Sequence, residues 1–358
     1  MVFCLLTFYH IKINVHLFKI LGRMYFSIIV PVFNRPDEIQ LFLKSVELQD
    51  YQQDFEIIII EDGSSISCQH VVDDFKAVLH LQYFAKQNSG PGDSRNYGMR
   101  RAKGDYFLIF DSDCELPSHY LSSVQKALQA DYVDCFGGRD AALPTFSNIQ
   151  KAINFAMTSF LTTGGIRGGS EKFDKFQPRS FNMGISKTAF QKSGGFGNIH
   201  PGEDPDLTIR LWNLGYKTKL VGDAFVYHKR RIDWKKFYTQ VNKFGKARPI
   251  LDYWYPEHQK YIFAFPTLFL VGFVLSILFV VAGNFYMFGL YTIYFLLIFF
   301  SASLQNRSLV VGFLSVIAVV IQFFGYGGGY LKSIFLLNIK NIKPEIAFPE
   351  LFFITDEN

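Results

Sequence analysis

The stretch that decides the fold runs from Gly104 to Leu116 and reads GDYFLIFDSDCEL. Residues 106–110 are apolar and rich in aromatics, which is typical of a buried strand. Asp111 and Asp113 follow directly, at what we expect to be the carboxyl end of that strand, where open α/β sheets bind ligands. Two carboxylates at this spacing can bind one hard divalent cation that also coordinates the phosphates of a substrate. A solvated acidic turn is the competing interpretation of so short a motif.

Composition divides the 358 residues into two parts. Up to about Pro249 the chain is mixed and soluble in character, whereas residues 261–337 are almost uncharged. The net charge of +5 is modest, and basic residues cluster just before the apolar part, which favours an anionic membrane surface. We see no nucleic-acid-binding motif and expect no nucleic-acid partner. The four cysteines lack paired spacing, so neither a zinc site nor a disulfide framework is expected.

Strands and helices alternate on the amino-terminal side of Gly104. The sequence predicts strands over 26–32, 55–60 and 81–84, and helices over 36–48, 71–79 and 93–102. Candidate ligand-binding residues follow two of these strands. They are Glu61-Asp62 after the second strand and the run Gly90-Pro91-Gly92 after the third. This alternation predicts a doubly wound, mainly parallel sheet of the nucleotide-binding type.

The segment that follows the organising strand also contains predicted elements. We expect a helix over 149–161, a Gly-rich loop over 162–169, a strand over 182–185 and a helix over 207–214. Acids at Glu203, Asp204 and Asp206 precede the last helix, where carboxylates often act as caps and dipole partners. That role is the simplest prediction for Asp206.

Several motifs, taken together and in order, resemble those of family 2 glycosyltransferases of the GT-A fold. They are SIIVPVFNRPDE, IIEDGSS, NSGPGDSRNYG, FDSDCE, FNMGISKTAF, GGFGNIHPGEDPDLTIRLWNLGYK and VYH. The resemblance covers roughly residues 26–248. It implies an α/β, nucleotide-diphospho-sugar transferase-like domain that moves a hexose from a nucleotide diphosphate sugar with inversion of configuration.

The same resemblance implies which residues bind the nucleotide sugar: Pro31, Asn34, Glu61, Asp62, Gly90, Arg95 and Asp111. Glu61 and Asp62 would meet uracil and ribose, which favours a UDP-sugar, although the family more often has Asp at position 61. Asp62-Gly63 is also ordinary turn chemistry. The helix start after Gly90 offers backbone N–H groups to a phosphate, with a plain Gly-Pro-Gly loop as the alternative.

A divalent metal, Mn²⁺ or Mg²⁺, is implied at Asp113, with Asp111 nearer the ribose and His228 as a further candidate ligand. Cys114 stands where many family members carry another acid. That change costs little, because the metal also takes ligands from the diphosphate. A lone histidine after an apolar run is more often structural, and this alternative stays open for His228.

By resemblance, Asp204 is the catalytic base and Glu203 positions the acceptor or its loop. Inverting transfer needs a base within hydrogen-bond reach of the acceptor hydroxyl. Arg167, Arg179 and Asn182 are candidates for the acceptor side, although surface arginines are common. The Gln-x-x-Arg-Trp signature of processive synthases is absent from the sequence, so we expect one sugar per encounter.

The apolar part predicts a membrane anchor. Segments 262–282, 285–303 and 309–326 are the candidate spans, and the first would extend ~30 Å as a helix. Residues 234–261 form a basic, aromatic juxtamembrane segment of interfacial character. A catalytic domain over 24–233 in the cytosol puts Arg307 inside but leaves later lysines outside, against the positive-inside rule. Either the third segment is re-entrant or interfacial, or the rule bends, so we expect two to three spans within 262–337 before a tail over 338–358.

Residues 1–23 are expected to be an extension before a natural start at Met24, with an amphipathic membrane-surface segment as the alternative. Together these features predict a multi-pass enzyme of the inner (cytoplasmic) membrane with its catalytic domain facing the cytosol. The expected acceptor is a membrane lipid, a lipid-linked saccharide or another envelope glycan precursor. A polyprenyl-phosphate sugar transferase and a non-catalytic scaffold subunit of an envelope glycan assembly complex are the two rival functions.

Overall fold

The structure, a computed structural model, describes residues 24–141, 146–164, 176–228 and 233–353. The prediction of an N-terminal extension over 1–23 therefore lies outside the described residues. The chain forms two compact units. The sheet unit comprises Met1–Ala141, Lys175–Phe196 and Arg210–Tyr227, and the helical unit comprises Ala142–Asp174, Gly197–Ile209 and His228–Asn358.

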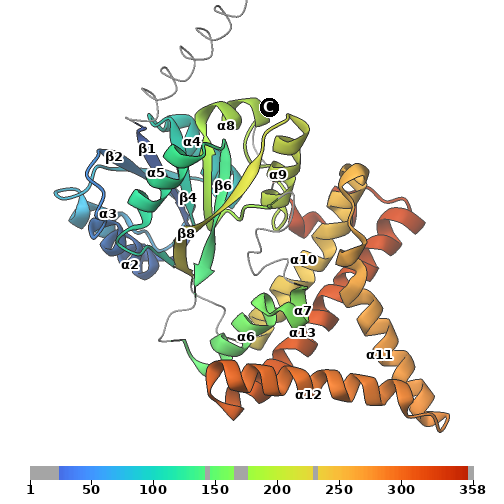
Figure 1. The fold of residues 1–358 in the computed structure, drawn as a ribbon. Helices are drawn as coiled ribbons and strands as arrows, with labels where there is room; N and C mark the ends of the chain where they lie inside the picture. Colours follow the sequence, from blue (N-terminus) through green and yellow to red (C-terminus); the bar gives the residue numbers. More distant parts are fainter. Residues whose placement is uncertain (1–23, 142–145, 165–175, 229–232, 354–358) are drawn as a thin grey trace, which may run out of the picture. The chain divides into compact units, whose positions relative to one another are not determined.

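One eight-stranded sheet forms the centre of the sheet unit (Figure 1). Its order is β3 (Leu81–Lys86), β2 (Phe55–Asp62), β1 (Phe26–Val32), β4 (Tyr106–Phe110), β7 (Asn182–Ser186), β6 (Cys135–Ala141), β8 (Thr218–His228) and β5 (Cys114–Glu115). The first four strands are parallel, whereas β7 runs antiparallel to both β4 and β6. The α/β prediction is confirmed, and the sheet is mixed because β7 is inserted between β4 and β6 in the opposite direction.

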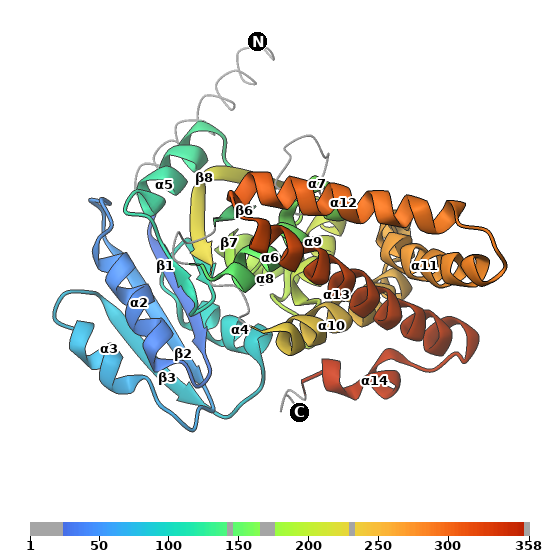
Figure 2. The ribbon, with the colours of Figure 1, turned by 90° about the horizontal axis from the view of Figure 1, so that it is seen from below.

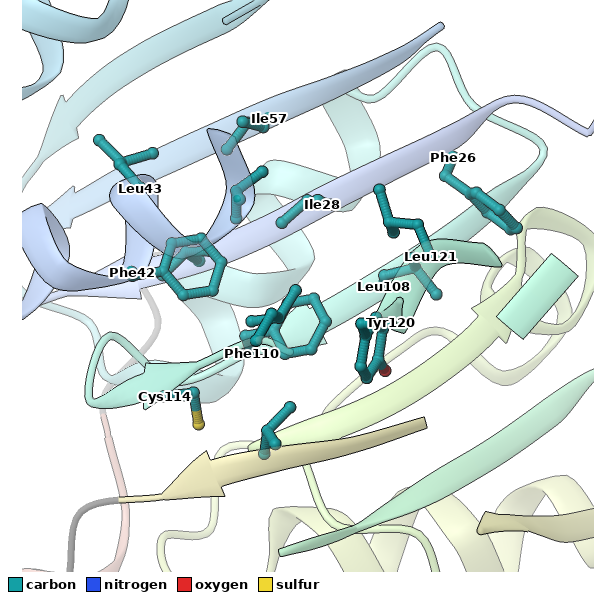
Figure 3. Close-up of a cluster of buried hydrophobic side chains, with 14 of the residues drawn as sticks. Phe26, Ile28, Phe42, Leu43, Ile57, Leu108, Phe110, Cys114, Tyr120 and Leu121 are labelled. Atoms are coloured by element: carbon teal, nitrogen blue, oxygen red, sulfur yellow. The ribbon is translucent and has the colours of Figure 1, made fainter. Parts of the chain in front are cut away.

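Alternate residues of the parallel strands build a core on one face of the sheet. Figure 3 shows Ile28 of β1, Ile57 of β2 and Leu108 of β4 among the side chains of this core. The covering helices are α2 (Pro36–Glu47), α3 (Gln69–Phe75) and α5 (Tyr120–Ala130), each with buried apolar residues in the same cluster. Because successive strand residues point to opposite faces, a continuous apolar run such as β1 must be covered on both sides.

The opposite face is covered by α4 (Pro91–Arg101) and α8 (Lys187–Ser193). A Cβ atom at Gly98 of α4 would lie 2.6 Å from Ile60 Cδ1 and 2.8 Å from Ile29 Cγ2, so only glycine lets this helix approach so closely. Phe190 of α8 packs edge-to-face on Phe107 of β4, with ring centroids 5.7 Å apart. The strands that end at the predicted site are therefore held rigidly from both sides.

Several element boundaries differ from the predictions. β2 and β3 each extend two residues further, to Asp62 and Lys86. Helix α9 (Glu203–Asn213) begins four residues earlier than predicted, so its three acids lie in the first helical turn and not before it. The helix expected over 149–161 is two helices, α6 (Asn148–Thr158) and α7 (Phe160–Thr163). A capping box between Ser147 and Gln150 starts α6.

Four long helices dominate the helical unit (Figure 2). They are α10 (Trp234–Trp254), α11 (Phe265–Val281), α12 (Tyr286–Asn306) and α13 (Leu309–Ile334), and α13 packs against each of the other three. Three helical stretches are long and apolar enough to cross a membrane, over Tyr261–Val281, Tyr286–Asn306 and Leu309–Ile339. The length and apolar composition of these stretches indicate a membrane protein.

The third apolar stretch is longer than predicted. The expected end near Tyr326 is wrong, because α13 continues through the Gly-rich run to Ile334 and then into a π-helical turn, Phe335–Ile339. A Cβ at Gly327 would lie 2.7 Å from the carbonyl oxygen of Pro266, and one at Gly329 would clash with the carbonyl oxygen of Asn242. These glycines are contact points for α11 and α10, not helix breakers.

Short elements complete the helical unit: the 3-10 turns η1 (Pro256–His258), η2 (Tyr261–Ala264) and η4 (Pro349–Leu351), and helix α14 (Pro344–Ala347). Phe348 and Leu351 are fully buried in a small cluster with Ile250 of α10. A β-bridge joins Ile199 to Phe352. The carboxyl-terminal segment is therefore packed onto the unit up to the last described residues.

Candidate active site

The parallel strands β1, β2 and β4 end at one edge of the sheet, and the strand order reverses at β1. Such a reversal opens a crevice that binds ligands in α/β sheets. In register, Val32 of β1 faces Glu61 of β2, so Asn34 and Asp62 follow within two residues of that pair. Asp111 follows the last residue of β4. The fold thus places the predicted nucleotide-sugar residues of three strands at one edge.

Asn34 shapes the loop that follows β2. Its backbone is left-handed, with φ 55°, which asparagine tolerates better than most residues. Its Oδ1 accepts hydrogen bonds from the N–H groups of Ser65 (2.8 Å) and Ile66 (2.9 Å), and its own N–H donates to Ser64 Oγ (2.8 Å). Pro31 lies inside β1, paired in register with Ile60. In the structure, Asn34 holds the loop between β2 and α3.

Glu61 is directed into the protein. It is 3% exposed, and its Oε2 accepts hydrogen bonds from Tyr83 Oη (2.7 Å), the Cys68 N–H (2.8 Å) and Ser67 Oγ (3.0 Å). Burial acts to raise the pKa of Glu61, but the hydrogen bonds of Ser64, Tyr83, Cys68 and Ser67 together lower it below its ordinary value. The ionised carboxylate therefore ties the start of α3 to β2 and β3.

Asp62 is buried in the same way, at 4% exposure. It forms an ion pair with Lys86 Nζ at 2.5 Å, and it accepts the N–H groups of Ser89 and Gly90, both at 3.0 Å. Gly90 adopts φ 91°, a conformation that favours glycine, immediately before α4. Two N–H groups of the loop in which we expected a phosphate site therefore donate to Asp62, and the phosphate role of this loop stays a prediction.

The carboxylates that follow β4 have a different environment. The side chain of Asp111 is 35% exposed and pairs with Arg95 Nη2 at 2.6 Å. Arg95 lies in α4, is 3% exposed, and its guanidinium packs over the Phe196 ring at 5.3 Å from the centroid. A buried, always charged guanidinium with fixed geometry orients a carboxylate well. Arg95 therefore positions Asp111 while leaving part of it open to solvent.

A tight turn carries Asp113. The Cys114 N–H donates to the Asp111 carbonyl at 3.2 Å, which places Asp113, partly exposed, at the third position of the turn. Burial, followed by the charges of Asp113 and Asp111, raises the pKa of the Cys114 thiol well above its ordinary value, and the thiol donates to the Phe181 carbonyl at 3.4 Å. In the absence of a metal the thiol is protonated, and its Sγ lies within 4.8 Å of an Asp113 carboxylate oxygen. Asp111 and Asp113 offer hard oxygen donors, which fit Mg²⁺ or Mn²⁺.

The acids of α9 also divide by environment. Glu203 is buried, pairs with His200 Nδ1 at 2.9 Å and accepts the Gly202 N–H at 2.9 Å. Asp206 is buried and accepts a hydrogen bond from Tyr255 Oη at 2.7 Å. Asp204 is partly exposed, and its main-chain carbonyl accepts the Thr208 hydroxyl at 2.8 Å. Among the three, Asp204 is therefore the only acid that is not fully buried.

The remaining predicted residues that the structure describes lie in or beside strands β7 and β8. Asn182 is fully buried in β7, where its Oδ1 accepts from Tyr120 Oη (2.5 Å) and its Nδ2 donates to the Ala224 carbonyl (2.8 Å). This use within the sheet gives no support to an acceptor-side role for Asn182. Arg179 is partly exposed and bridges to Asn182 through its backbone. His228 ends β8, and Arg167 lies outside the described residues.

Sequence reasoning missed Lys86 and Tyr83, which both belong to β3. Lys86 pairs with Asp62 and also lies 3.4 Å from Asp93 of α4. Its signal in the sequence is its position at the carboxyl end of the third parallel strand. Tyr83 could not be found this way, because its hydroxyl meets Glu61 only through the pairing of β2 with β3.

Comparison with protein families gives two overlapping matches. The model described as glycosyl transferase family 2 matches residues 27–194, and that described as glycosyl transferase family group 2 matches residues 180–313. The first covers β1 to α8, and the second continues from β7 into α13. The matches therefore include the acidic edge of the sheet and the start of the third apolar stretch.

Two curated relatives show the range of similarity. A GalNAc(5)-diNAcBac-PP-undecaprenol beta-1,3-glucosyltransferase of Campylobacter jejuni is 36% identical over 114 residues, which is 31% of this chain and 37% of that protein. The probable glycosyltransferase YdaM of Bacillus subtilis is 24% identical over 83% of this chain and 71% of that protein. Matches to two uncharacterised Rickettsia glycosyltransferases span only 12% and 16% of those proteins, so the chain covers a minor part of several of its relatives.

Among solved structures, the mannosyltransferase PcManGT of Pyrobaculum calidifontis, in complex with GDP-Man and Mn²⁺, aligns with a TM-score of 0.60. The alignment covers 83% of this chain and 87% of that chain at 15% sequence identity, a level that establishes the fold alone. The family matches, the mixed α/β sheet and this structural likeness agree with one another. The chain belongs to family 2 of the glycosyltransferases and has the GT-A fold, followed by helices long and apolar enough to span a membrane.

Proposed function

We propose that this glycosyltransferase moves a hexose, with inversion, from a nucleotide diphosphate sugar to a lipid-linked saccharide or another envelope glycan precursor. The observation that carries the proposal is the turn after β4, where Asp111 is oriented by the buried Arg95 and Asp113 follows two residues later at a ligand-binding sheet edge. The Campylobacter jejuni relative is named for a lipid-linked saccharide, and this name supports the same class of acceptor here. A UDP-sugar is the favoured donor, from the resemblance at Glu61 and Asp62.

In this proposal Asp113 and Asp111 hold a divalent metal, with His228 as a further ligand suggested by the family resemblance. When bound, Mn²⁺ or Mg²⁺ neutralises charge on the leaving diphosphate, which no protein acid then needs to protonate. Arg95 keeps the Asp111 carboxylate, which would contact the ribose and the metal, in one orientation. Asp62 and Glu61 shape the nucleotide pocket by fixing the loops that precede α4 and α3.

Asp204 is the proposed base. It takes the proton of the acceptor hydroxyl while that oxygen bonds to the anomeric carbon and the bond from this carbon to the diphosphate breaks. A single displacement inverts the anomeric configuration. Glu203 is already held by His200 and Gly202, so its part is to fix the first turn of α9, which carries Asp204.

We further propose that residues 24–233 are the catalytic domain, 234–261 the juxtamembrane segment, 262–337 the anchor and 338–358 the tail. The three apolar helical stretches support an acceptor that resides in the membrane. We propose a multi-pass protein of the inner membrane with its catalytic domain in the cytosol, transferring one sugar per encounter.

The test is transfer by the full-length protein in lipid nanodiscs, with a panel of nucleotide sugars and two acceptors: polyprenyl phosphate and a polyprenyl-diphosphate-linked saccharide. Transfer to the saccharide with inverted configuration is expected. Transfer to the bare phosphate alone would identify the enzyme as a polyprenyl-phosphate sugar transferase. A product with retained configuration would overturn the proposed mechanism.

Asp204→Asn is the sharpest variant for this test. Because the change is nearly isosteric, donor binding should survive while the transfer rate falls ~10²–10⁴-fold, as is typical when a general base is lost. The matched control is Asp206→Asn in the same helical turn. It removes the charge of the carboxylate that accepts the Tyr255 hydrogen bond and should mainly lower thermal stability. Wild-type transfer by Asp204→Asn would rule out this base.

A further inference from the structure

The helical unit contains a cavity of about 260 Å³ between the end of α10 and the end of α13. One wall comes from α10 and η1, with Pro249, Asp252, Tyr253 and Pro256. The other comes from Tyr330, Ile334 and Asn338. Tyr330, Ile334 and Asn338 lie four residues apart, so this wall is one continuous helical face, whereas the first wall passes from the end of α10 into η1.

A buried carboxylate forms part of the wall. Asp252 is 8% exposed, and its Oδ1 accepts from Arg248 Nη2 at 2.8 Å. Its Oδ2 is buried and has no hydrogen-bond partner among the residues that the structure describes. Buried polar atoms almost always have a partner, so a lone carboxylate oxygen beside a cavity calls for a donor. The structure therefore supplies an acceptor whose partner is not part of the described chain.

The charge of this carboxylate is already balanced within the wall. Arg248 is buried, lies over the Phe263 ring at 3.9 Å from its centroid, and donates to the His258 carbonyl at 3.3 Å. A cation in the cavity would meet Arg248 beside Asp252. An anion would meet the Asp252 carboxylate, and none of the lining residues is basic. The electrostatics thus favour a neutral occupant that brings hydrogen-bond donors.

The rest of the lining fits a ring that carries hydroxyl groups. Tyr253, Gln259 and Asn338 are exposed, and their side chains can both donate and accept hydrogen bonds. Pro249 and Ile334 offer apolar surface to the carbon face of such a ring. The volume is slightly below the ~300–1,000 Å³ of sites for drug-sized ligands, so the occupant is small.

The cavity lies at the end of a candidate membrane span. Tyr330 and Ile334 belong to the apolar stretch Leu309–Ile339, and Lys332 and Lys340 flank that end. Lysines at the end of an apolar helix are typical of the level of lipid headgroups. A ring with hydroxyl groups at this level can come from a glycolipid headgroup or from a free sugar.

We propose that this cavity binds a neutral, polyhydroxylated ring of monosaccharide size, with Asp252 accepting hydrogen bonds from its hydroxyl groups. The proposal does not depend on the transfer reaction. All residues of the site belong to the helical unit, and the test measures binding and not transfer.

The test uses the full-length protein in phosphatidylcholine nanodiscs. Binding of methyl β-D-glucopyranoside is followed by saturation-transfer NMR, and retention of monoglucosyl diacylglycerol by native mass spectrometry after delipidation. Retention of the glycolipid alone identifies a headgroup site, and binding of the glucoside identifies a site for free sugar. Failure of the wild-type protein to bind either probe overturns the proposal.

Ile334→Trp narrows the cavity from the α13 wall while both residues of the Arg248–Asp252 pair are kept, and it should weaken binding at least tenfold. The matched control is Ile339→Trp, five residues along, at an exposed position outside the lining. This control should bind as the wild type does. Equal binding by Ile334→Trp and the wild type would assign the probe to another site and overturn the proposal. Asp252→Asn should also weaken binding, with Ile334→Trp deciding the outcome if that variant misfolds.

Discussion

Two pairs of acidic residues lie at the same edge of the sheet, one at the end of β2 and the other after β4. The environments of the two pairs differ. Glu61 and Asp62, at the end of β2, are buried and accept hydrogen bonds from hydroxyl, amine and backbone donors of the chain. Asp111 and Asp113, after β4, are partly exposed. A buried carboxylate that is bonded to the chain mainly holds loops in place, whereas one open to solvent can still bind a ligand. Acid pairs that look alike in sequence thus have different uses.

Of the substitutions that compare the two acidic pairs, Asp113→Asn should have the largest effect. Removing one carboxylate of the proposed metal pair should cost about 3 kcal/mol of transition-state stabilisation, or ~10²-fold in transfer rate. Thermal stability should change little, because Asp113 is partly exposed. Nucleotide-sugar affinity measured with and without Mn²⁺ checks the role. Equal metal-dependent gains in affinity for mutant and wild type would contradict it.

Asp62→Asn should act mainly on stability. It removes one of the two carboxylates that pair with Lys86, whose side chain is largely buried, and weakens the bonds from Ser89 and Gly90. We expect a loss of about 2–3 kcal/mol in the free energy of unfolding, measured by thermal or denaturant unfolding in detergent. The matched control is Asp73→Asn, whose pair with Lys76 is exposed and should contribute less than about 0.5 kcal/mol. Similar losses for both variants would show that burial does not decide how much each ion pair stabilises the protein.

Glu61→Gln should destabilise the protein in a pH-dependent way. The pKa of Glu61 is lowered in the folded state, so its stabilisation is present above the ordinary value of 4.5 and is lost as the pH falls through the folded value. At pH 7 the variant should lose ~1 kcal/mol, because glutamine keeps one acceptor oxygen but not the charge. The stabilities of variant and wild type should therefore converge as the pH falls from 4.5 through the folded-state pKa. A constant difference across this range would show that ionisation is not involved.

Cys114→Ser should have the smallest effect. Mg²⁺ and Mn²⁺ prefer oxygen ligands to sulfur, so the metal dependence of transfer should be unchanged. Stability should fall by about 1 kcal/mol, because a hydroxyl replaces a buried thiol. Activity titrated with Mn²⁺ and with the softer Cd²⁺ provides the measurement. A change in metal preference would show that the sulfur is a ligand after all.

The sequence by itself determined most of the strands and helices, and the strand ends at which the candidate site residues lie. The bounds of β1 and β4 agree with the prediction, because apolar runs flanked by Gly, Pro and acids are local signals. The GT-A fold and the family could be predicted because they depend on the order of such motifs. The apolar stretches could also be predicted, since length and composition suffice for them.

The tertiary structure decided how each carboxylate is used. Whether an acid is buried depends on donors far along the chain, such as Tyr83 for Glu61 and Tyr255 for Asp206. The glycines of α13 carry the same lesson, since their close contacts with α10 and α11 turn a local helix-breaking signal into a packing surface. Local patterns reveal which residues are available, but hydrogen-bond partners and close contacts are set by strand pairing and helix packing. Those long-range contacts separate the carboxylates that build this protein from those that remain open to a ligand.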